Sequence, residues 1–276
     1  MTATAMTTGR EAAFTGSVAE LYDSVLVPMI FDAYAGDLAS RVAAIQPSRV
    51  LEIAAGTGSA TRALARALPA SVELVATDLN QPMLDRAAAV GTAQPVQWRQ
   101  ADAMHLPFGD RSFDVVACQF GVMFFPDKVR AFSELRRVLR PGGSLVFNTW
   151  DRIEVNEFAH TVTQALARHF PSDPPRFMER TPHGYFDPRA IAGDLAGAGF
   201  EARPGIETRT ECSRAPEATV AAIAYCQGTP MRGEIEARSN GGLDDATAAC
   251  TEAIRARFGG GPIEGRIQAH VVAVQG

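Results

Sequence analysis

Short apolar runs alternate with longer amphipathic stretches between residues 49 and 150, and this alternation is the strongest pattern in the chain. Each run has the length of a buried strand, whereas the stretches between the runs repeat their apolar side chains at helical spacing. The runs predicted as strands are 50–53, 72–76, 96–101, 112–120 and 144–150. Strands that alternate with helices form a parallel sheet with right-handed crossovers. The pattern therefore predicts a doubly wound α/β core over residues 49–150.

The segments on either side of this core extend the predicted fold. Helical spacing over residues 14–45 predicts an N-terminal helical cap (residues 1–45) over the cleft of the main domain (residues 46–276), with residues 1–13 disordered. After the core we expect a helix, a proline-rich loop, a second helix and two more strands, at 154–170, 171–188, 187–198, 201–211 and 266–274. These two strands bring the predicted sheet to seven.

A long connection, at about residues 212–265, separates the last two predicted strands. It contains two helical stretches, near 215–226 and 243–257. The sequence leaves two roles open for this helical insertion before the last strand. It is either part of a substrate-binding region or the contact surface of a homodimer.

The first predicted strand runs directly into a glycine turn, Gly56-Thr57-Gly58, and a helix follows at once. This arrangement is how an open α/β sheet presents backbone amides to a nucleotide-like ligand. A side chain at Gly56 or Gly58 would hold the ligand away from the backbone or prevent the turn. Glu52 is an acid inside the apolar strand, so it needs a partner, either the amides of the turn or a ligand. The turn predicts a small-molecule cofactor.

Two classes of cofactor compete for this site. A dinucleotide fingerprint requires a small residue at its sixth position, where this chain has Thr61. Asp78 ends the second predicted strand and suits both classes, because an acid there accepts hydrogen bonds from ribose hydroxyls. It is also placed to cap the helix that begins near Gln81. Asp102 ends the third predicted strand and is either a ligand contact or a turn residue.

Further motifs follow in a characteristic order after the glycine turn. The series is Glu52 to Gly58, Asp78, Asp102-Ala103, Leu106-Pro107-Phe108, Phe113 to Val116, and Arg137 to Gly143. With these motifs, residues 50–150 resemble the class I S-adenosylmethionine-dependent methyltransferases, most closely the ubiquinone/menaquinone-biosynthesis type. Ala54 departs from the family pattern because it replaces the first glycine. The resemblance implies a Rossmann-like, mostly parallel sheet, and it covers the last 120 or so residues poorly.

The resemblance also assigns a cofactor, S-adenosyl-L-methionine, and the residues that would bind it. The methionine and ribose would lie against the turn, formed by Ala54, Ala55, Gly56 and Gly58, with Glu52 facing the amino-acid end. The ribose hydroxyls would bind Asp78, and the adenine would contact Leu79, Met83, Asp102, Ala103 and Met104. Gln119 and Phe120 would meet the methionine amino group and the acceptor. Leu79 and Met83 fit the hydrophobic core equally well.

The methyl acceptor is less determined by the sequence. Aromatic side chains in segments expected to cover the cleft indicate a small, apolar or aromatic acceptor, although each fits the core equally well; they include Tyr22, Phe124, Trp150 and Tyr185. Transfer to oxygen, nitrogen or carbon stays open. Only a weakly acidic acceptor needs a general base. His183, in the proline-rich loop, is the base that we would name in that case.

Composition and charge narrow the class of protein. The net charge of −5 and the lack of a basic stripe argue against a nucleic-acid partner. The longest apolar stretch, Val115 to Phe125, is too short to span a membrane, and no signal peptide is apparent. Four cysteines without C-x-x-C spacing indicate reduced thiols and a cytoplasmic protein. His105 lies near Asp102, but no third residue is spaced to complete a metal site. Two alternatives remain, a non-catalytic S-adenosylmethionine-binding protein and, less favoured, a dinucleotide-dependent oxidoreductase.

Overall fold

The computed structural model describes residues 20–238 and 242–276. The predicted disorder of residues 1–13 lies outside them. The chain divides into two compact units. Unit 1 contains Met1–Phe31, Asp151–Gly184 and Thr210–Gln268, and unit 2 contains Asp32–Trp150, Tyr185–Arg209 and Ala269–Gly276. The predicted division into an N-terminal cap (residues 1–45) and a main domain (residues 46–276) stays a prediction.

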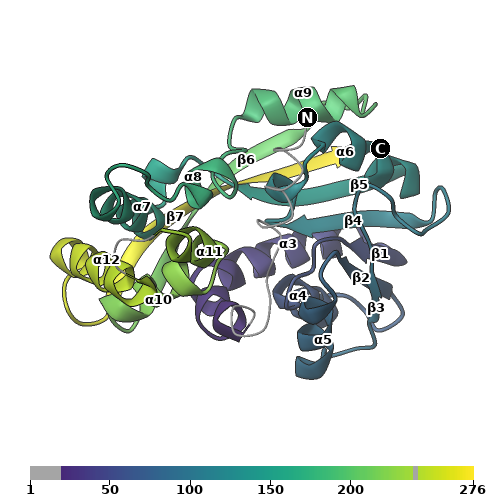
Figure 1. Ribbon diagram of the computed structural model, residues 1–276. Helices are drawn as coiled ribbons and strands as arrows, with labels where there is room; N and C mark the ends of the chain where they lie inside the picture. Colours follow the sequence, from purple (N-terminus) through teal and green to yellow (C-terminus); the bar gives the residue numbers. More distant parts are fainter. Residues whose placement is uncertain (1–19, 239–241) are drawn as a thin grey trace. The chain divides into compact units, whose positions relative to one another are not determined.

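The seven predicted strands form one mixed sheet in the order β3-β2-β1-β4-β5-β7-β6 (Figure 1). The strands are β1 (Arg49–Glu52), β2 (Glu73–Asp78), β3 (Gln97–Gln100), β4 (Phe113–Gln119), β5 (Leu139–Trp150), β6 (Gly205–Ala215) and β7 (Ile263–Gln275). Strands β1 to β5 pair in parallel, and β7 pairs antiparallel with β5. The α/β, mostly parallel prediction is confirmed. Strand β6 begins four residues later than expected, after Pro204, which has no backbone N–H to give to a sheet.

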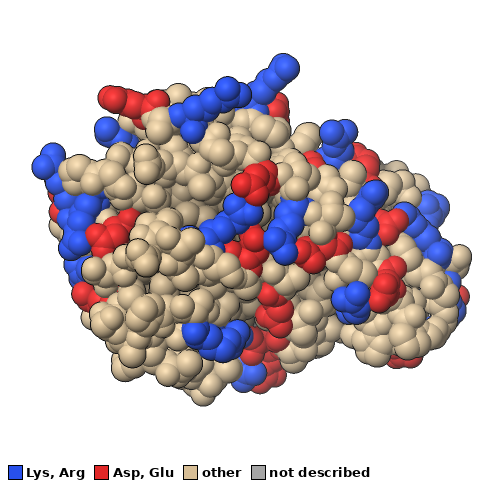
Figure 2. All heavy atoms as spheres, turned by 180° about the vertical axis from the view of Figure 1, so that it is seen from behind, with Lys and Arg blue, Asp and Glu red and all other residues tan. Residues whose placement is uncertain are grey.

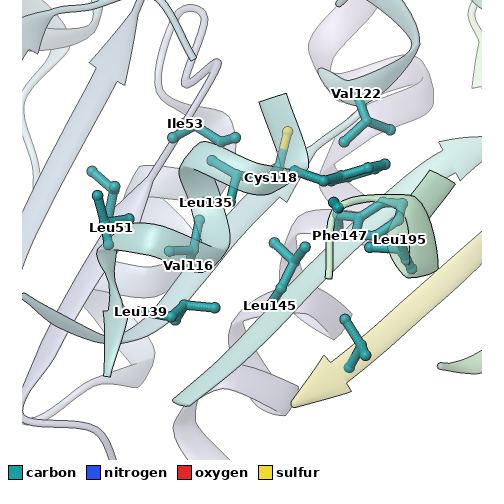
Figure 3. Packing of buried hydrophobic residues seen from close by; sticks show 14 of the residues in the cluster. Leu51, Ile53, Val116, Cys118, Val122, Leu135, Leu139, Leu145, Phe147 and Leu195 are labelled. Carbon is teal, nitrogen blue, oxygen red and sulfur yellow. The ribbon is translucent and has the colours of Figure 1, made fainter. Parts of the chain in front are cut away.

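Helices cover both faces of this sheet in unit 2. They are α3 (Asp32–Ala44), α4 (Ser59–Ala67), α5 (Gln81–Val90), α6 (Lys128–Val138) and α9 (Pro188–Gly197), with a short 3-10 turn, η2 (Val122–Phe124). Successive strand residues point to opposite faces. Val50 therefore packs with α3 and α4, whereas its neighbour Leu51 packs with Phe132 of α6 and Leu195 of α9. Figure 3 shows the second of these two cores.

Unit 1 is mainly helical. Its helices are η1 (Tyr22–Phe31, a π-helix), η3 (Ile153–Val155), α7 (Glu157–His169), α8 (Phe177–Arg180), α10 (Ala218–Gln227), α11 (Met231–Glu236) and α12 (Leu243–Phe258). Three of these helices, α10 to α12, lie in the segment predicted as a helical insertion. The proline-rich loop contains the single turn α8. In this unit the ring of Phe158 packs edge-on against Phe258 at 4.9 Å between centroids.

Asn156, at the N-terminal end of α7, joins that helix to β7 within unit 1. Its side-chain amide nitrogen donates to the carbonyls of Asp151 (3.2 Å) and Gln268 (3.3 Å), and its side-chain oxygen accepts from the Gln268 amide (2.9 Å). The residue is 1% exposed. Loss of the side chain would therefore leave buried backbone groups without partners.

We expect Asn156→Ala to lower the free energy of unfolding by roughly 2–4 kcal/mol, because buried groups that lose hydrogen bonds keep their desolvation cost. Urea unfolding followed by circular dichroism measures this loss. Gln164→Ala, at an exposed position of the same helix, is the control and should change stability by less than about 0.5 kcal/mol. Equal losses in the two variants would contradict this role of Asn156.

Candidate cofactor site

The predicted cofactor residues lie where neighbouring parallel strands end. Strands β3, β2, β1, β4 and β5 are adjacent and parallel, so their carboxyl ends meet at one edge of the sheet. The strand order reverses between β1 and β4, and ligands bind at such a switch point in open α/β sheets. The edge carries the last residues of three of these strands, Glu52 of β1, Asp78 of β2 and Gln119 of β4.

The two glycines of the turn after β1, Gly56 and Gly58, have different roles. Both have positive φ, +56° at Gly56 and +86° at Gly58. No atom lies within 4 Å of the position that a Cβ on Gly56 would occupy, so the backbone is bare there. A Cβ on Gly58 would instead meet Ala87 at 3.0 Å and the Trp98 ring at 3.3 Å. Gly56 therefore leaves room for a ligand, and Gly58 lets helix α4 start close to its neighbours.

Ala54 stands in the left-handed region, with φ of +52°. A non-glycine residue pays roughly 1–2 kcal/mol for this conformation, so the family's usual glycine has a physical reason at this position. The Ala54 methyl group lies against Gly121, in the turn after β4. A Cβ on Gly121 would come within 2.4 Å of it and within 2.7 Å of Cys118 Sγ. The alanine therefore requires a glycine at position 121.

Asp78 fixes the glycine turn. Its Oδ2 accepts the Gly56 amide at 2.8 Å, and its Oδ1 accepts the Asn80 amide at 2.8 Å. The N-cap of α5 is Asn80, so Asp78 does not cap that helix. Burial raises the pKa of Asp78, against the opposing effect of these hydrogen bonds. The carboxylate thus connects the ends of β1 and β2.

Glu52 is the second buried acid of the site, with 1% exposure. Its Oε2 is sealed from solvent and has no hydrogen-bond partner among the described residues. Burial raises the pKa of Glu52 to about 8, and the charge of Asp78 raises it further, while the Thr61 hydroxyl lowers it in part. An acid in this state is well suited to receive a cationic group.

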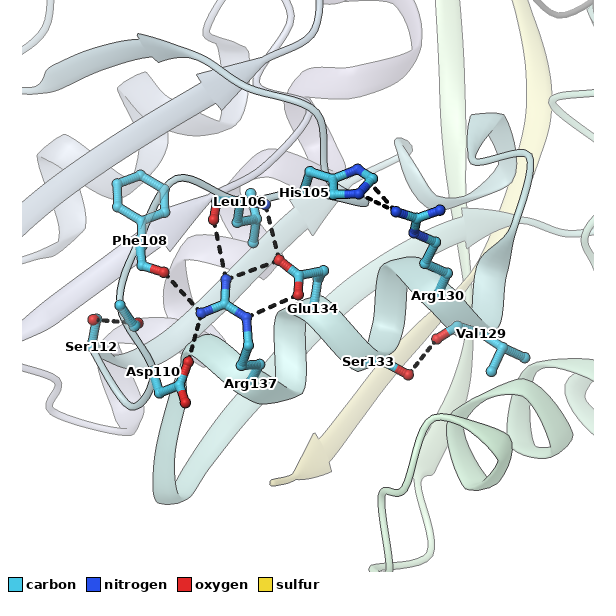
Figure 4. Close-up of polar contacts among 11 residues, drawn as sticks. His105, Leu106, Phe108, Asp110, Ser112, Val129, Arg130, Ser133, Glu134 and Arg137 are labelled. Atoms are coloured by element: carbon cyan, nitrogen blue, oxygen red, sulfur yellow. Dashed lines mark hydrogen bonds and ion pairs between the residues drawn. The ribbon is translucent and has the colours of Figure 1, made fainter.

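The loop after β3 carries Asp102, Ala103 and Met104, all half-buried. The Asp102 carboxylate accepts the Met104 amide at 2.8 Å, and its carbonyl accepts the His105 amide at 2.9 Å. The loop is joined to the Asp78 region because the Ala101 amide donates to the Asp78 carbonyl at 3.0 Å. Its far end is held by side chains of α6 (Figure 4), which the sequence had not singled out for this purpose.

Leu79 and Met83, both predicted to contact adenine, differ in exposure. Leu79 is 52% exposed beside Asp78, whereas Met83 is 3% exposed in the core. The adenine contacts of both residues stay predictions.

The turn after β4 is built from aromatic and backbone contacts. Phe120 has φ of +50°, and its amide donates to Asn148 Oδ1 at 3.0 Å. Its ring stacks on Trp150 at the end of β5, 3.9 Å between centroids and 8° between planes. The Tyr34 ring meets both edge-on. Gln119, just before this turn, is half-buried.

Lys128, the first residue of α6, closes this turn. Its Nζ donates to the carbonyls of Phe125 (2.6 Å) and Met123 (3.1 Å), and it lies 5.0 Å from the centre of the Tyr185 ring. Burial lowers the pKa of Lys128. Sequence reasoning missed this residue. The only signal in the sequence was its position just after Pro126-Asp127, where α6 begins.

The residues predicted to meet the acceptor are divided between the units. Phe124, Trp150 and Tyr185 belong to unit 2, and the Tyr185 hydroxyl is engaged as a donor to Asp194 (2.8 Å). Tyr22 and His183 belong to unit 1. The His183 Nδ1 lies 2.8 Å from the Asp151 carbonyl, and burial lowers its pKa to about 4. His183 is therefore uncharged at neutral pH.

Residues 20–238 and 242–276 offer neither a metal site nor a membrane-spanning helix. No group of three or more histidine, cysteine, aspartate or glutamate side chains is arranged to hold a metal ion there. Within the same residues no helix has the length and apolar character needed to cross a membrane. Basic and acidic side chains lie next to one another over the face shown in Figure 2.

The chain is similar to known proteins mainly over the core of unit 2. Residues 51–147 match the family described as methyltransferase domain. A demethylmenaquinone methyltransferase from Lactiplantibacillus plantarum is 45% identical over 103 residues, which are 36% of this chain and 44% of the relative. The ubiquinone/menaquinone biosynthesis C-methyltransferase UbiE of Stutzerimonas stutzeri is 31% identical over 56% of this chain and 65% of its own length. The chain thus spans less than two thirds of either relative.

Two solved structures share the fold at low identity. A Bacillus halodurans protein has a TM-score of 0.56 at 20% identity, covering 88% of this chain and 98% of its own. The [4+2]-cyclase SpnF has a TM-score of 0.53 at 18% identity, covering 88% and 80%. These likenesses show a common architecture, which by itself does not fix the reaction.

Glu52→Gln tests the buried acid. Because the folded-state pKa of Glu52 lies above its ordinary value, the folded wild type loses stability relative to the unfolded chain as pH rises from about 4.5 to about 8. The neutral variant escapes this loss. We expect its stability advantage to grow by roughly 2–4 kcal/mol between pH 5 and pH 8.5, measured by urea unfolding. Glu73→Gln, at the partly exposed start of β2, is the control; a pH-independent difference for Glu52→Gln would refute the interpretation.

An exchange of alanine and glycine tests the contact between the two turns. Gly121→Ala should destabilise the chain by about 1–3 kcal/mol through overpacking. The double variant Ala54→Gly/Gly121→Ala should recover part of this loss, since it removes the nearest clashing carbon. Chemical unfolding of the single and double variants gives the coupling energy. Gly109→Ala, where a Cβ would meet only ordinary contacts, is the matched control; strictly additive effects would mean that the two turns do not touch as described.

Proposed function

Because residues 51–147 belong to the class I S-adenosylmethionine-dependent methyltransferases of the ubiquinone/menaquinone type, we propose that this chain methylates a small, apolar, aromatic acceptor. The observation that carries the proposal is the turn after β1. Its bare backbone at Gly56 is held by a buried carboxylate, that of Asp78, and it lies next to a second buried acid, Glu52.

The residues of this turn fit the cofactor. The open space beside Gly56 admits a ligand against the backbone, and the unpartnered Oε2 of Glu52 offers an acceptor to an ammonium group. Asp78 would bind the ribose hydroxyls, and Asp102 the exocyclic amine of adenine. When bound, S-adenosyl-L-methionine supplies a methyl group on a sulfonium centre, which needs no further activation by the protein.

The work left to the chain is binding, alignment and exclusion of water. The buried acids would orient the cofactor, Glu52 through its unpartnered Oε2 and Asp78 through a carboxylate held in place by the Gly56 and Asn80 amides. Phe120 and Trp150 stack on each other at the ends of β4 and β5. As an aromatic wall of the acceptor site, these rings would favour a flat, apolar acceptor over a charged one.

A hydroxylated aromatic ring is the acceptor class that we favour. The curated relatives are described as acting on demethylmenaquinone and in ubiquinone and menaquinone biosynthesis. On such a ring a hydroxyl group increases the electron density of the neighbouring carbon, which would attack the methyl group and then lose its proton. His183, the base that the sequence predicts, lies in unit 1, and its role as the proton acceptor stays a prediction.

Calorimetric titration with S-adenosylhomocysteine, with NADH in parallel, tests the cofactor. We expect binding of S-adenosylhomocysteine alone. Asp78→Ala should weaken it by roughly 1–3 kcal/mol, the scale of hydrogen bonds to a charged group. Asp78→Asn keeps an oxygen for the Gly56 amide and separates loss of the charge from loss of the turn. Binding of NADH alone would overturn the proposal.

A panel of acceptors then tests the reaction. Methyl transfer from labelled S-adenosylmethionine to a reduced, water-soluble demethylmenaquinone analogue is the first assay, followed by simple phenols and amines. Turnover of the ring compounds supports the favoured class. Binding of the cofactor without turnover on the whole panel would favour a non-catalytic binding protein instead.

A further inference from the structure

Helix α6 presents a polar face to the loop that follows β3 (Figure 4). The side chains of Arg130, Glu134 and Arg137 lie four and three residues apart, so they fall on one side of the helix. All three reach residues 105–110, which belong to no helix or strand. The loop therefore depends on α6 for contacts that regular structure would otherwise supply.

Arg137 uses all five of its side-chain N–H groups in this contact. Nη1 donates to the Phe108 carbonyl (2.9 Å) and to Asp110 Oδ1 (2.8 Å). Nη2 donates to the Leu106 carbonyl (3.1 Å) and to Glu134 Oε2 (2.9 Å), and Nε donates to Glu134 Oε1 (2.9 Å). One guanidinium thus binds two loop carbonyls, one loop carboxylate and its neighbour on α6.

Glu134 binds the same loop residue as Arg137, Leu106, through its other backbone group. Its Oε2 accepts the Leu106 amide at 3.0 Å while Arg137 binds the Leu106 carbonyl. Arg137 also lowers the pKa of Glu134, which keeps the carboxylate charged. Both backbone groups of Leu106 are therefore held by one ion pair. Arg130 adds a contact to the His105 ring.

The loop leads directly to the candidate adenine contacts. Only three residues separate Asp102 from Leu106, and a turn closed by the Asp102 carbonyl and the His105 amide links them. The Asp102 carboxylate is part of that turn through the Met104 amide. A displacement of Leu106 would therefore move the Asp102 carboxylate, although Arg137 itself makes no contact with Asp102.

We propose that Arg137 is a positioning residue for the cofactor: through residues 105–110 it holds the Asp102 carboxylate in place for the exocyclic amine of adenine. The inference rests on the proposed function, because it takes the cofactor to be an adenosyl compound. Arg137 would thus affect cofactor binding without contacting the cofactor itself. Lysine cannot replace it, since one ammonium with three donors cannot reach three loop groups and bind Glu134.

The test compares two ligands that differ at one group. S-adenosylhomocysteine carries the exocyclic amine, and its 6-unsubstituted purine riboside analogue carries a hydrogen in its place while keeping N1 as an acceptor. The wild type should prefer the adenosyl ligand by roughly 10- to 100-fold, the scale of a hydrogen bond to a charged group. We expect the preference to fall below about 3-fold in Arg137→Gln and to an intermediate value in Arg137→Lys.

The ratio of the two affinities distinguishes positioning from general damage. Partial unfolding lowers both affinities by the same factor, so it leaves the ratio unchanged. Arg140→Gln is the matched control, because Arg140 lies in the same motif but pairs with Asp114 (2.5 Å), away from this loop. It should keep the wild-type preference.

Each outcome has one meaning. A preference that persists in Arg137→Gln and Arg137→Lys overturns the role of Arg137 while the proposed function stands. A wild type that binds both ligands equally removes Asp102 from the adenine site, and the inference fails with it. A wild type that binds neither ligand overturns the proposed function itself.

Discussion

The hydrogen bond from the Gly56 amide to the Asp78 carboxylate is the contact on which the rest of the site depends. It fixes the turn after β1 against the end of β2, so that the bare side of Gly56 faces open space. The Ala54 methyl group is then placed against Gly121, which connects the turn after β4 to the same point. The ends of three strands are thus connected by one buried carboxylate and by the close contact of Ala54 with Gly121.

This arrangement has an energetic cost in the free protein. Glu52 and Asp78 are both buried and both have raised pKa values, and the charge of Asp78 further raises the pKa of Glu52. Residues that only stabilised the fold would not be expected to combine burial, a nearby like charge and an unpartnered oxygen. A ligand with a positive charge and hydroxyl donors would offset the cost of burying these acids, balance their charge and give Glu52 Oε2 a partner. The strain at Ala54 and Phe120, both with positive φ, lies at the same edge of the sheet.

The sequence predicted what depends on local pattern, and it missed what depends on contacts across the fold. Apolar runs located β1, β2, β4 and β5, because a buried strand carries its own signal, whereas β3 (Gln97–Gln100) is mostly polar and exposed and carries a weaker one. The start of β6 was misplaced, since Pro204 and its neighbours gave no clear boundary. The need for glycine at position 58 was recognised from the turn, and its φ of +86° confirms that reason, while packing against Ala87 and Trp98 is a second reason that the sequence does not display. The functions of Arg137 and Lys128 were not recognised, because their partners are backbone carbonyls, which no sequence pattern displays.

Helix α6 anchors one segment on the cofactor side and one segment on the acceptor side of the proposed site. Its first residue, Lys128, binds carbonyls of the turn after β4, and its last turn, through Arg137, binds carbonyls of the loop after β3. The turn after β4 carries Phe120 of the aromatic wall, and the loop after β3 carries the candidate adenine contacts. Since one rigid helix anchors both, a shift of either segment would strain the other. The methyl donor and its acceptor must be aligned to within a fraction of an ångström, and a shared anchor keeps two separate loops in that alignment without any direct contact between them.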